Sequence, residues 1–239
     1  VRRHFQGTLV WRDRAWLVGG DIFSTMPEAY SYQHDIYSSA DGVDWDLELA
    51  QTPWSDRIFE VAGIFNDQMW VVGGQTGLSS DDSGNTQFYN DVWRSDDGVT
   101  WTEVAPNGPP SATRWSPRGV LNKMVEFNGE LWLVGGGTYQ TYDVPIQEFP
   151  AEAWSTTDGV TWTEHSVPWS GRIYHTVEVF DGKLWVIGGC HETTCNSNDA
   201  WYTEDGENWT EIPYQRSPQP VSHGDGVAVG PDFLLFAGG

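Results

Sequence analysis

The sequence predicts an all-β fold of the propeller class, and two repeated glycine signals carry this prediction. A Gly-Gly pair closes an apolar run five times, at intervals of 54, 62, 53 and 50 residues, which is the spacing of propeller blades. An Asp-Gly pair precedes the last run of each of the first four copies, and this dipeptide tolerates the positive φ angles of a tight hairpin. Each complete copy is therefore expected to form a four-stranded antiparallel meander.

The copy at Trp169–Glu211 shows the pattern of runs most fully. Its four runs are rich in Val, Ile, Thr and Trp, which suit a pleated surface. Across the copies, tryptophans recur just before Gly-Gly, in the third run and in the fourth run. Eleven of the 15 tryptophans fall in these places, so the tryptophan richness is mainly structural. They are Trp16, Trp70, Trp132, Trp185, Trp93, Trp154, Trp201, Trp45, Trp101, Trp162 and Trp209.

These motifs resemble those of the kelch family of β-propellers. The matching features are Gly-Gly, the fourth-run tryptophan, and the Asn-Asp-x-Trp entry to the third run at 90–93 and 198–201. The segment Asp-Gly-Val-Thr-Trp-Thr-Glu, at 97–103 and 158–164, is similar to the form found in bacterial secreted kelch-repeat proteins. The resemblance covers almost the whole chain. It implies a kelch-type β-propeller in an extracytoplasmic location, either secreted or at the cell surface.

In chain order, the copies divide one domain, 1–239, into four complete blades and half of a fifth. The first blade is expected to have strands near 4–11, 15–18, 35–39 and 45–49, with a loop at 21–34. The last copy offers only two strands, near 226–229 and 233–236. Since a propeller closes its ring to cover edge strands, we expect completion by further sequence, as in a fragment of a larger propeller, or by another chain. The blades fall at 3–49, 54–104, 115–165 and 169–212, and the half blade at 221–239.

The composition limits the possible partners. Apolar residues make up 38% of the 239 residues and charged residues 19%, which is typical of a folded domain and not of a disordered one. The formal net charge of −22 repels phosphate backbones and anionic lipids, so neither nucleic acid nor a membrane surface is an expected partner. No apolar run reaches the roughly 20 residues that span a bilayer. The acidic surface suits solubility.

The two cysteines, Cys190 and Cys195, lie in one short loop with the sequence Cys-His-Glu-Thr-Thr-Cys. A disulfide between them fits an oxidising compartment. Free thiols and a metal site that includes His191 are the alternatives, although the spacing matches no common zinc site. A second loop carries Asp81, Asp82 and Asn85, which offer oxygen ligands for Ca²⁺ without the twelve-residue EF-hand spacing. We therefore expect no cofactor and no resident metal.

A candidate binding site follows from the direction of the strands. In an antiparallel meander the first strand begins, and the second strand ends, on the same face of the disc. Trp-Ser-x-Arg segments precede the first strands, and the long loops follow Gly-Gly, so both groups are expected on that face. The planar guanidinium group of arginine can bind carboxylates or sulfates, and the flat indole ring of tryptophan can pack against sugar rings. The candidate ligand contacts are Trp54, Trp115, Trp169, Arg3, Arg57, Arg118 and Arg172.

Polar residues a few positions after these arginines are expected to line the central channel. They include Glu60 and His175, which complete the candidate site, together with Gln6, Asn122 and Asp225. The alternative for the arginines and tryptophans is structural, since residues at equivalent blade positions also hold neighbouring blades together. The sequence leaves both interpretations open.

The functional prediction is a non-enzymatic binding or scaffold module that recognises a protein or a glycan or other anionic ligand on this face. No residue is assigned as catalytic. The first alternative is a carbohydrate-active enzyme resembling the kelch-like sialate mutarotases, with Glu60 or His175 as acid and base, or, more remotely, a sialidase. The chain lacks the Tyr, His and Cys set of galactose oxidase. The second alternative is an assembly subunit whose half blade is completed by another chain.

Overall fold

The structure is a computed structural model that describes residues 7–24, 29–76, 86–120, 123–138, 148–191, 197, 199–212, 225–229 and 233–237. Every regular element in this part of the chain is a β-strand. It therefore contains no helix able to cross a membrane.

Four antiparallel four-stranded sheets form the blades, as the repeated pattern predicts. Blade 1 is β1 (Gly7–Trp11), β2 (Arg14–Val18), β5 (Ile36–Ser39) and β6 (Asp46–Leu49). Blade 2 is β7 (Val61–Phe65), β8 (Gln68–Val72), β9 (Val92–Ser95) and β10 (Trp101–Ala105). Blade 3 is β11 (Val125–Phe127), β12 (Glu130–Val134), β13 (Glu152–Thr156) and β14 (Thr163–Ser166). Blade 4 is β15 (Thr176–Phe180), β16 (Lys183–Ile187), β17 (Ala200–Thr203) and β18 (Trp209–Ile212).

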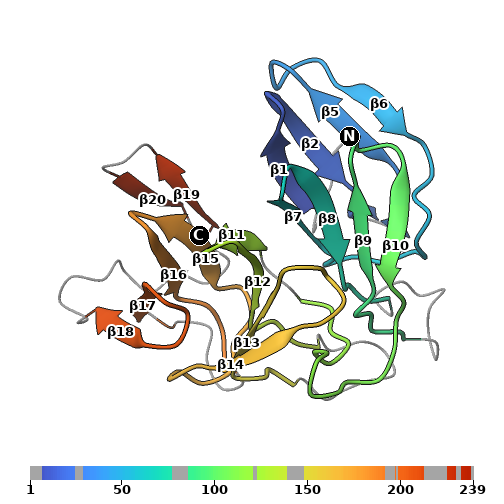
Figure 1. Ribbon diagram of the computed structural model, residues 1–239. Coiled ribbons are helices and arrows are strands. Elements are labelled where there is room, and N and C mark those ends of the chain that lie inside the picture. Colours follow the sequence, from blue (N-terminus) through green and yellow to red (C-terminus); the bar gives the residue numbers. More distant parts are fainter. Residues whose placement is uncertain are drawn as a thin grey trace.

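The blades follow one another around a common centre, with β19 (Asp225–Val229) and β20 (Phe233–Ala237) as the half blade after blade 4 (Figure 1). Strand β19 contacts β15 of blade 4, as the first strands of successive blades contact each other elsewhere. Blade 1 and the half blade lie at the two ends of this arc. The fold is thus a kelch-type β-propeller of four complete blades and a half blade.

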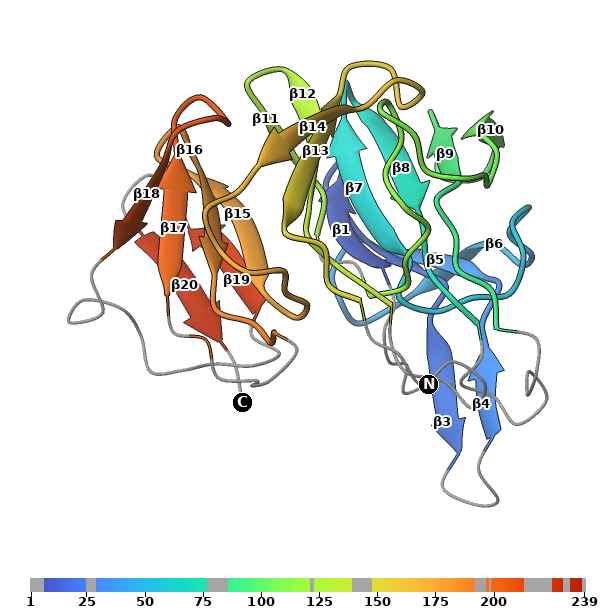
Figure 2. The same ribbon diagram turned by 90° about the horizontal axis from the view of Figure 1, so that it is seen from below.

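The segment 21–34, predicted to be a loop, contains a further hairpin. Strands β3 (Asp21–Ser24) and β4 (Ala29–Tyr32) pair in antiparallel register, with Asp21 opposite Tyr32. In Figure 2 this hairpin projects from the face of the disc at which β7 begins and β8 ends. Only the second of these strands, Ala29-Tyr30-Ser31-Tyr32, has a large aromatic residue at every other position, and in Asp21-Ile22-Phe23-Ser24 the two apolar residues are adjacent.

The Asp-Gly turns are built alike in all complete blades. In blade 2, Gly98 has a φ of 78°, and its N–H donates to Ser95 Oγ at 2.8 Å. The Asp97 carboxylate accepts hydrogen bonds from the N–H groups of Val99 and Thr100 at 2.8 and 2.6 Å. Glycine is favoured at the position of Gly98 because the left-handed backbone conformation there is unfavourable for residues that carry a Cβ.

Replacing Gly98 with alanine is expected to destabilise the protein far more than the same change at Gly42. Both residues have positive φ, which costs alanine about 1–2 kcal/mol. At Gly98, however, the new Cβ would lie 2.5 Å from the Trp16 ring of blade 1, whereas at Gly42 no described residue other than its chain neighbours lies within 4 Å. Overpacking adds about 1–3 kcal/mol at Gly98. Urea unfolding of both variants measures the difference, and equal losses would show that the ring does not press on the turn.

Candidate functional site

The residues after each Trp-Ser-x-Arg segment pair with the residues after Gly-Gly in the same blade. The isolated bridges are Ile58 with Gln75, Val120 with Gly137, and Ile173 with Cys190. In these three blades the first strand therefore begins beside the end of the second strand, at the face that lies at the lower side of Figure 2, from which the β3–β4 hairpin projects. The arrangement places the three described Trp-Ser-x-Arg segments at one end of the propeller. Arg3 lies outside the described residues.

The guanidinium group of Arg57 is held inside its own blade. It donates to both oxygens of Asp91, at 2.5 and 2.9 Å, and to the carbonyl of Gly73 at 2.9 Å. The side chains of Arg57 and Asp91 are only 2% and 5% exposed. This bidentate geometry uses the planar fork of arginine fully, so little of it is left for a ligand.

The arginines of blades 3 and 4 repeat this arrangement. Arg172 donates to both oxygens of Asp199 at 2.8 Å and to the carbonyl of Gly188 at 2.9 Å. Arg118 pairs with Glu152, and it donates to the carbonyl of Gly135 at 2.9 Å. Both guanidinium groups are buried. The structure therefore favours the structural interpretation that the sequence left open for these arginines.

The three tryptophans of the same segments pack against the fourth-strand tryptophan of their own blade. The rings of Trp54 and Trp101 meet edge to face with centroids 5.0 Å apart, and those of Trp169 and Trp209 with centroids 4.6 Å apart. Trp115 meets its partner in the same way and is fully buried. Edge-to-face packing of this kind stabilises a core. These rings present little surface to a ligand.

Glu60 reaches from blade 2 to the Gly-Gly pair of blade 1. Its Oε1 accepts a hydrogen bond from the N–H of Gly20 at 3.2 Å, and its Oε2 has no hydrogen-bond partner among the described residues. Burial of the carboxyl group, with a smaller contribution from the charge of Asp21, raises the pKa of Glu60 to about 7. The side chain is only 4% exposed, so this acid lies between two blades and not on an open surface.

His175 makes the corresponding contact from blade 4 to blade 3. Its Nε2 lies 3.1 Å from the Val134 carbonyl, to which it donates, while no residue in the described part of the chain hydrogen-bonds to Nδ1. Burial, followed by the nearby charge of Arg172, lowers the pKa of His175 to about 3. The imidazole is neutral at physiological pH. Glu60 and His175 thus serve at two different blade junctions, while Gln6 and Asn122 lie outside the described residues.

Two aromatic residues beside these polar groups were not selected from the sequence. Phe59 and Tyr174 have φ values of 60° and 56°, in the left-handed region that bulky side chains rarely adopt. Each stands between the paired arginine and the polar residue of its blade. Strained backbone of this kind costs about 1–3 kcal/mol and concentrates at functional sites. The signal in the sequence is the matching order Arg-Ile-Phe-Glu and Arg-Ile-Tyr-His.

Phe59 and Tyr174 belong to an apolar group that we name the mouth cluster. It brings together residues from blades 2, 3 and 4 with Tyr32 of the β3–β4 hairpin, so it lies where the blades converge. Tyr32 and Tyr174 are only partly buried and give the cluster an aromatic surface. Its members are Ile58, Phe59, Val120, Phe149, Ile173, Cys190, Tyr32 and Tyr174.

Cys190 forms a disulfide, which is one of the alternatives that the sequence left open, and the sequence contains one other cysteine, Cys195. Cys195 itself lies outside the described residues. An oxidised Cys190 cannot act as a thiolate ligand, which removes the metal interpretation of this loop. No group of three metal-ligating side chains occurs in the described ranges. Asp81, Asp82 and Asn85, the Ca²⁺ candidates, lie outside those ranges.

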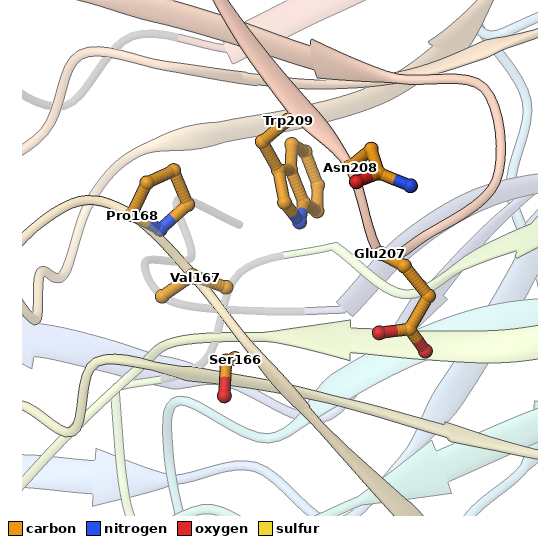
Figure 3. A pocket seen from close by; sticks show the side chains of 6 residues that line it. All are labelled: Ser166, Val167, Pro168, Glu207, Asn208 and Trp209. Atoms are coloured by element: carbon orange, nitrogen blue, oxygen red, sulfur yellow. The ribbon is translucent and has the colours of Figure 1, made fainter.

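A shallow pocket lies away from the mouth cluster, at the junction of blades 3 and 4. Figure 3 shows the connection before Trp169 facing the Asp-Gly turn of blade 4, with the Trp209 ring between them. Glu207 at its edge is 64% exposed and pairs with His165. None of the site residues predicted from the sequence lines this pocket. Its lining is Ser166, Val167, Pro168, Glu207, Asn208 and Trp209.

Comparison with known proteins supports the assignment made from the blades. The kelch motif matches residues 171–213, which comprise blade 4 and the preceding Arg172. The solved structure of YjhT superposes on 99% of this chain and 72% of its own, with a TM-score of 0.71 and 16% sequence identity. The fold is that of a kelch-type β-propeller, and blade 4 carries a kelch motif.

Relatives by sequence include proteins of different kinds. The leucine-zipper-like transcriptional regulator 1 of Pongo abelii is 27% identical over 206 residues, which are 81% of this chain but 22% of that protein. The N-acetylneuraminate epimerase of Pasteurella multocida is 23% identical over 247 residues, covering 90% of this chain and 62% of the epimerase. The chain thus spans about a fifth of the regulator and under two thirds of the epimerase.

Proposed function

We propose that this propeller is a non-enzymatic binding module whose ligand meets the mouth cluster. The observation that supports this most is the strained backbone of Phe59 and Tyr174 at equivalent places in two blades. A strained conformation persists only where the surrounding structure imposes it, and it fixes the direction of the side chain. The residues directly after Gly-Gly in blades 2, 3 and 4 lie at the face from which the β3–β4 hairpin projects, so a ligand there would touch several blades.

The chemistry of the face indicates the kind of ligand. The arginines that would bind an anion are already paired with carboxylates of their own blades, and the net charge of −22 repels anions at a distance. Tyrosine faces attract apolar groups and cations. We therefore propose a protein segment with exposed apolar and basic side chains as the ligand. Kelch propellers generally mediate protein interactions, which agrees with this choice.

Replacing Tyr174 with glycine is expected to abolish binding while leaving the fold intact. Glycine adopts the φ of 56° without strain, which offsets part of the packing lost with the ring. A panel of basic and acidic peptides, neutral sugars and N-acetylneuraminate would be screened by saturation-transfer NMR. The same hits are then measured against the variant.

Asn66→Gly is the matched control, because Asn66 has a φ of 52° in an exposed turn remote from the mouth cluster. It should bind like the parent chain. Full affinity in Tyr174→Gly, or a parent chain that binds nothing in the panel, would refute the proposal.

A sialate-type carbohydrate enzyme remains the second candidate. The similarity to an N-acetylneuraminate epimerase supports it, as does a carboxyl group, Glu60, whose pKa of about 7 suits proton transfer. The pairing of Arg57, Arg118 and Arg172 speaks against it, since the carboxylate of the sugar needs a free cation. Faster anomeric exchange of N-acetylneuraminate, lost in Glu60→Gln, would favour this candidate over the binding module.

We further propose an extracytoplasmic location. The disulfide of Cys190 supports it, because structural disulfides persist mainly in oxidising compartments.

A further inference from the structure

The connection between blades 2 and 3 caps the start of the outer strand of blade 3 with a turn. Ser111 and Arg114 bridge to each other, so the segment between them is tight. The Thr113 carbonyl accepts a hydrogen bond from the backbone N–H of Trp162 at 3.0 Å. Trp162 itself is only 2% exposed. The chain thus supplies an example of how a peptide turn binds to the outer edge of a blade.

The connection between blades 3 and 4 is too short to form such a turn. From the fourth-strand tryptophan to the next Trp-Ser-x-Arg segment it takes seven positions, against fourteen between blades 2 and 3. The shallow pocket lies at the corresponding place, and Figure 3 shows the Trp209 ring between Pro168 and Asn208. Trp209 is the counterpart of Trp162 and is only partly buried. Within the described part of the chain, the outer strand of blade 4 is therefore open where that of blade 3 is capped.

The outer strands of blades 3 and 4 run in the same register. Thr163 of β14 and Thr210 of β18 each lie four positions after the turn glycine, and each pairs with the residue that follows the third-strand tryptophan. Because alternate N–H groups of a strand point to opposite sides, the N–H of Trp209 is directed outward as that of Trp162 is. An outward N–H on an edge strand can bind a carbonyl of another segment.

The open edge of blade 4 differs from the capped edge of blade 3 in its charge. Glu207 stands where blade 3 has Val160, and its side chain is 64% exposed. The Nδ1–H of His165 donates to Glu207 Oε1 at 2.8 Å, which holds the carboxylate at the edge of the pocket. Ser166 and Asn208 add a hydroxyl and an amide to the lining. An exposed, positioned carboxylate at this place favours a ligand with a basic side chain.

The apolar part of the lining suits the nonpolar atoms of a turn. Val167, Pro168 and the Trp209 ring form it. Trp209 meets Trp169 edge to face with centroids 4.6 Å apart, so its ring is held in place. The net charge of −22 attracts a basic partner from a distance as well. The pocket therefore offers a fixed aromatic ring, an exposed carboxylate and a backbone donor together.

We propose that this pocket is a second binding site, at which a turn of a partner protein carrying a basic side chain docks on the outer strand of blade 4. One backbone carbonyl of the turn accepts from the Trp209 N–H, as Thr113 does from Trp162. The basic side chain pairs with Glu207, and apolar atoms beside it pack on Pro168 and the indole ring. The site shares no residue with the mouth cluster, so it goes beyond the function proposed above.

The probe is the chain's own turn, prepared as a free cyclic peptide of residues 106–114 in which Ala112→Lys adds the basic side chain. Titration into ¹⁵N-labelled protein is followed by NMR. The backbone amide of Trp209 should shift saturably. The lysine peptide should bind about fivefold more tightly than the unsubstituted peptide, as expected for a partly exposed ion pair. This advantage should vanish in Glu207→Gln, whose amide oxygen can still accept from His165.

Glu103→Gln is the matched control, because it removes an exposed carboxylate from the outer strand of blade 2. It should keep the fivefold advantage of the lysine peptide. Tyr174→Gly should keep it too, since the mouth cluster takes no part. The result therefore does not depend on whether the mouth cluster binds a ligand.

A Trp209 amide that shifts at no peptide concentration would overturn the proposal, as would an advantage of the lysine peptide that Glu103→Gln also removes. Shifts confined to the mouth cluster would overturn it as well. The same titration with N-acetylglucosamine covers another class of ligand. A Trp209 shift caused by the sugar and not by the peptides would assign the pocket to carbohydrate instead.

Discussion

The variant Asp91→Ala is expected to lose about 3–5 kcal/mol of unfolding free energy, the usual loss when one partner of a buried ion pair is removed. The reason is the charge that remains. Arg57 is 2% exposed and would keep only its hydrogen bonds to Ser55 and to the Gly73 carbonyl. Trp93 would also lose the acceptor of its indole N–H, since Asp91 Oδ2 lies 2.9 Å away. Urea unfolding at neutral pH measures the loss.

An exposed ion pair of the same type provides the control for this prediction. Arg14 and Asp46 are 31% and 73% exposed and form a charged pair at 2.5 Å. Asp46→Ala should cost no more than about 1 kcal/mol, as exposed pairs usually do. If both variants lose the same small amount of unfolding free energy, the buried pair of Arg57 and Asp91 does not stabilise blade 2.

The second large effect is a pH dependence of stability set by His175 and Glu60. The pKa of His175 is lowered to about 3 in the folded protein, so the unfolded chain takes up this proton first. Its contribution to stability is present at neutral pH and is lost as the pH falls from 6.5 towards 3. At 1.36 kcal/mol for each pKa unit, the loss is about 5 kcal/mol.

Glu60 acts in the opposite direction. Its pKa is raised to about 7, so the folded protein holds a proton that the unfolded chain releases near pH 4.5. Its contribution is fully present below pH 4.5 and is lost as the pH rises to 7, which costs about 3 kcal/mol. Between pH 4.5 and 6.5 the two groups cancel, so the parent chain hides both effects.

Single variants separate the two groups. Glu60→Gln should be more stable than the parent chain by about 3 kcal/mol at pH 8, with the gain fading below pH 7. His175→Gln should lack the fall in stability below pH 6.5 that the histidine causes. Urea midpoints from pH 3 to 8 give both difference curves. If the stability of each variant changes with pH in parallel with that of the parent chain, neither Glu60 nor His175 has the shifted pKa that burial gives it in the folded protein.

The repeat made most of the fold predictable from the sequence. Gly-Gly and Asp-Gly mark backbone positions with positive φ, and these positions fix the turns that divide each blade. The β3–β4 hairpin was missed because it adds a strand pair outside the repeat. The packing between blades could not be predicted from the sequence either, because the contact of the Trp16 ring with Gly98 depends on how two sheets stack.

The candidate site was less predictable than the fold. The sequence placed Arg57 and Trp54 near one face, but burial and pairing decide their role, and neither can be read from spacing. The Asn-Asp-x-Trp motif held the missing information, because Asp91 and Asp199 are the partners of the arginines. The positive φ of Tyr174 could not be predicted, because nothing in the identity of a tyrosine signals it.

The central claim is that the paired arginines build the blades and that the neighbouring aromatic side chains meet the ligand. It is tested by measuring the affinity of the tightest panel hit for Tyr174→Gly and for the double variant Arg172→Met, Asp199→Leu. Replacing both members of a buried pair with apolar residues is often tolerated, so the double variant should fold. We predict that the double variant keeps the affinity and that Tyr174→Gly loses it. Loss of affinity in the double variant with full binding by Tyr174→Gly would contradict this account.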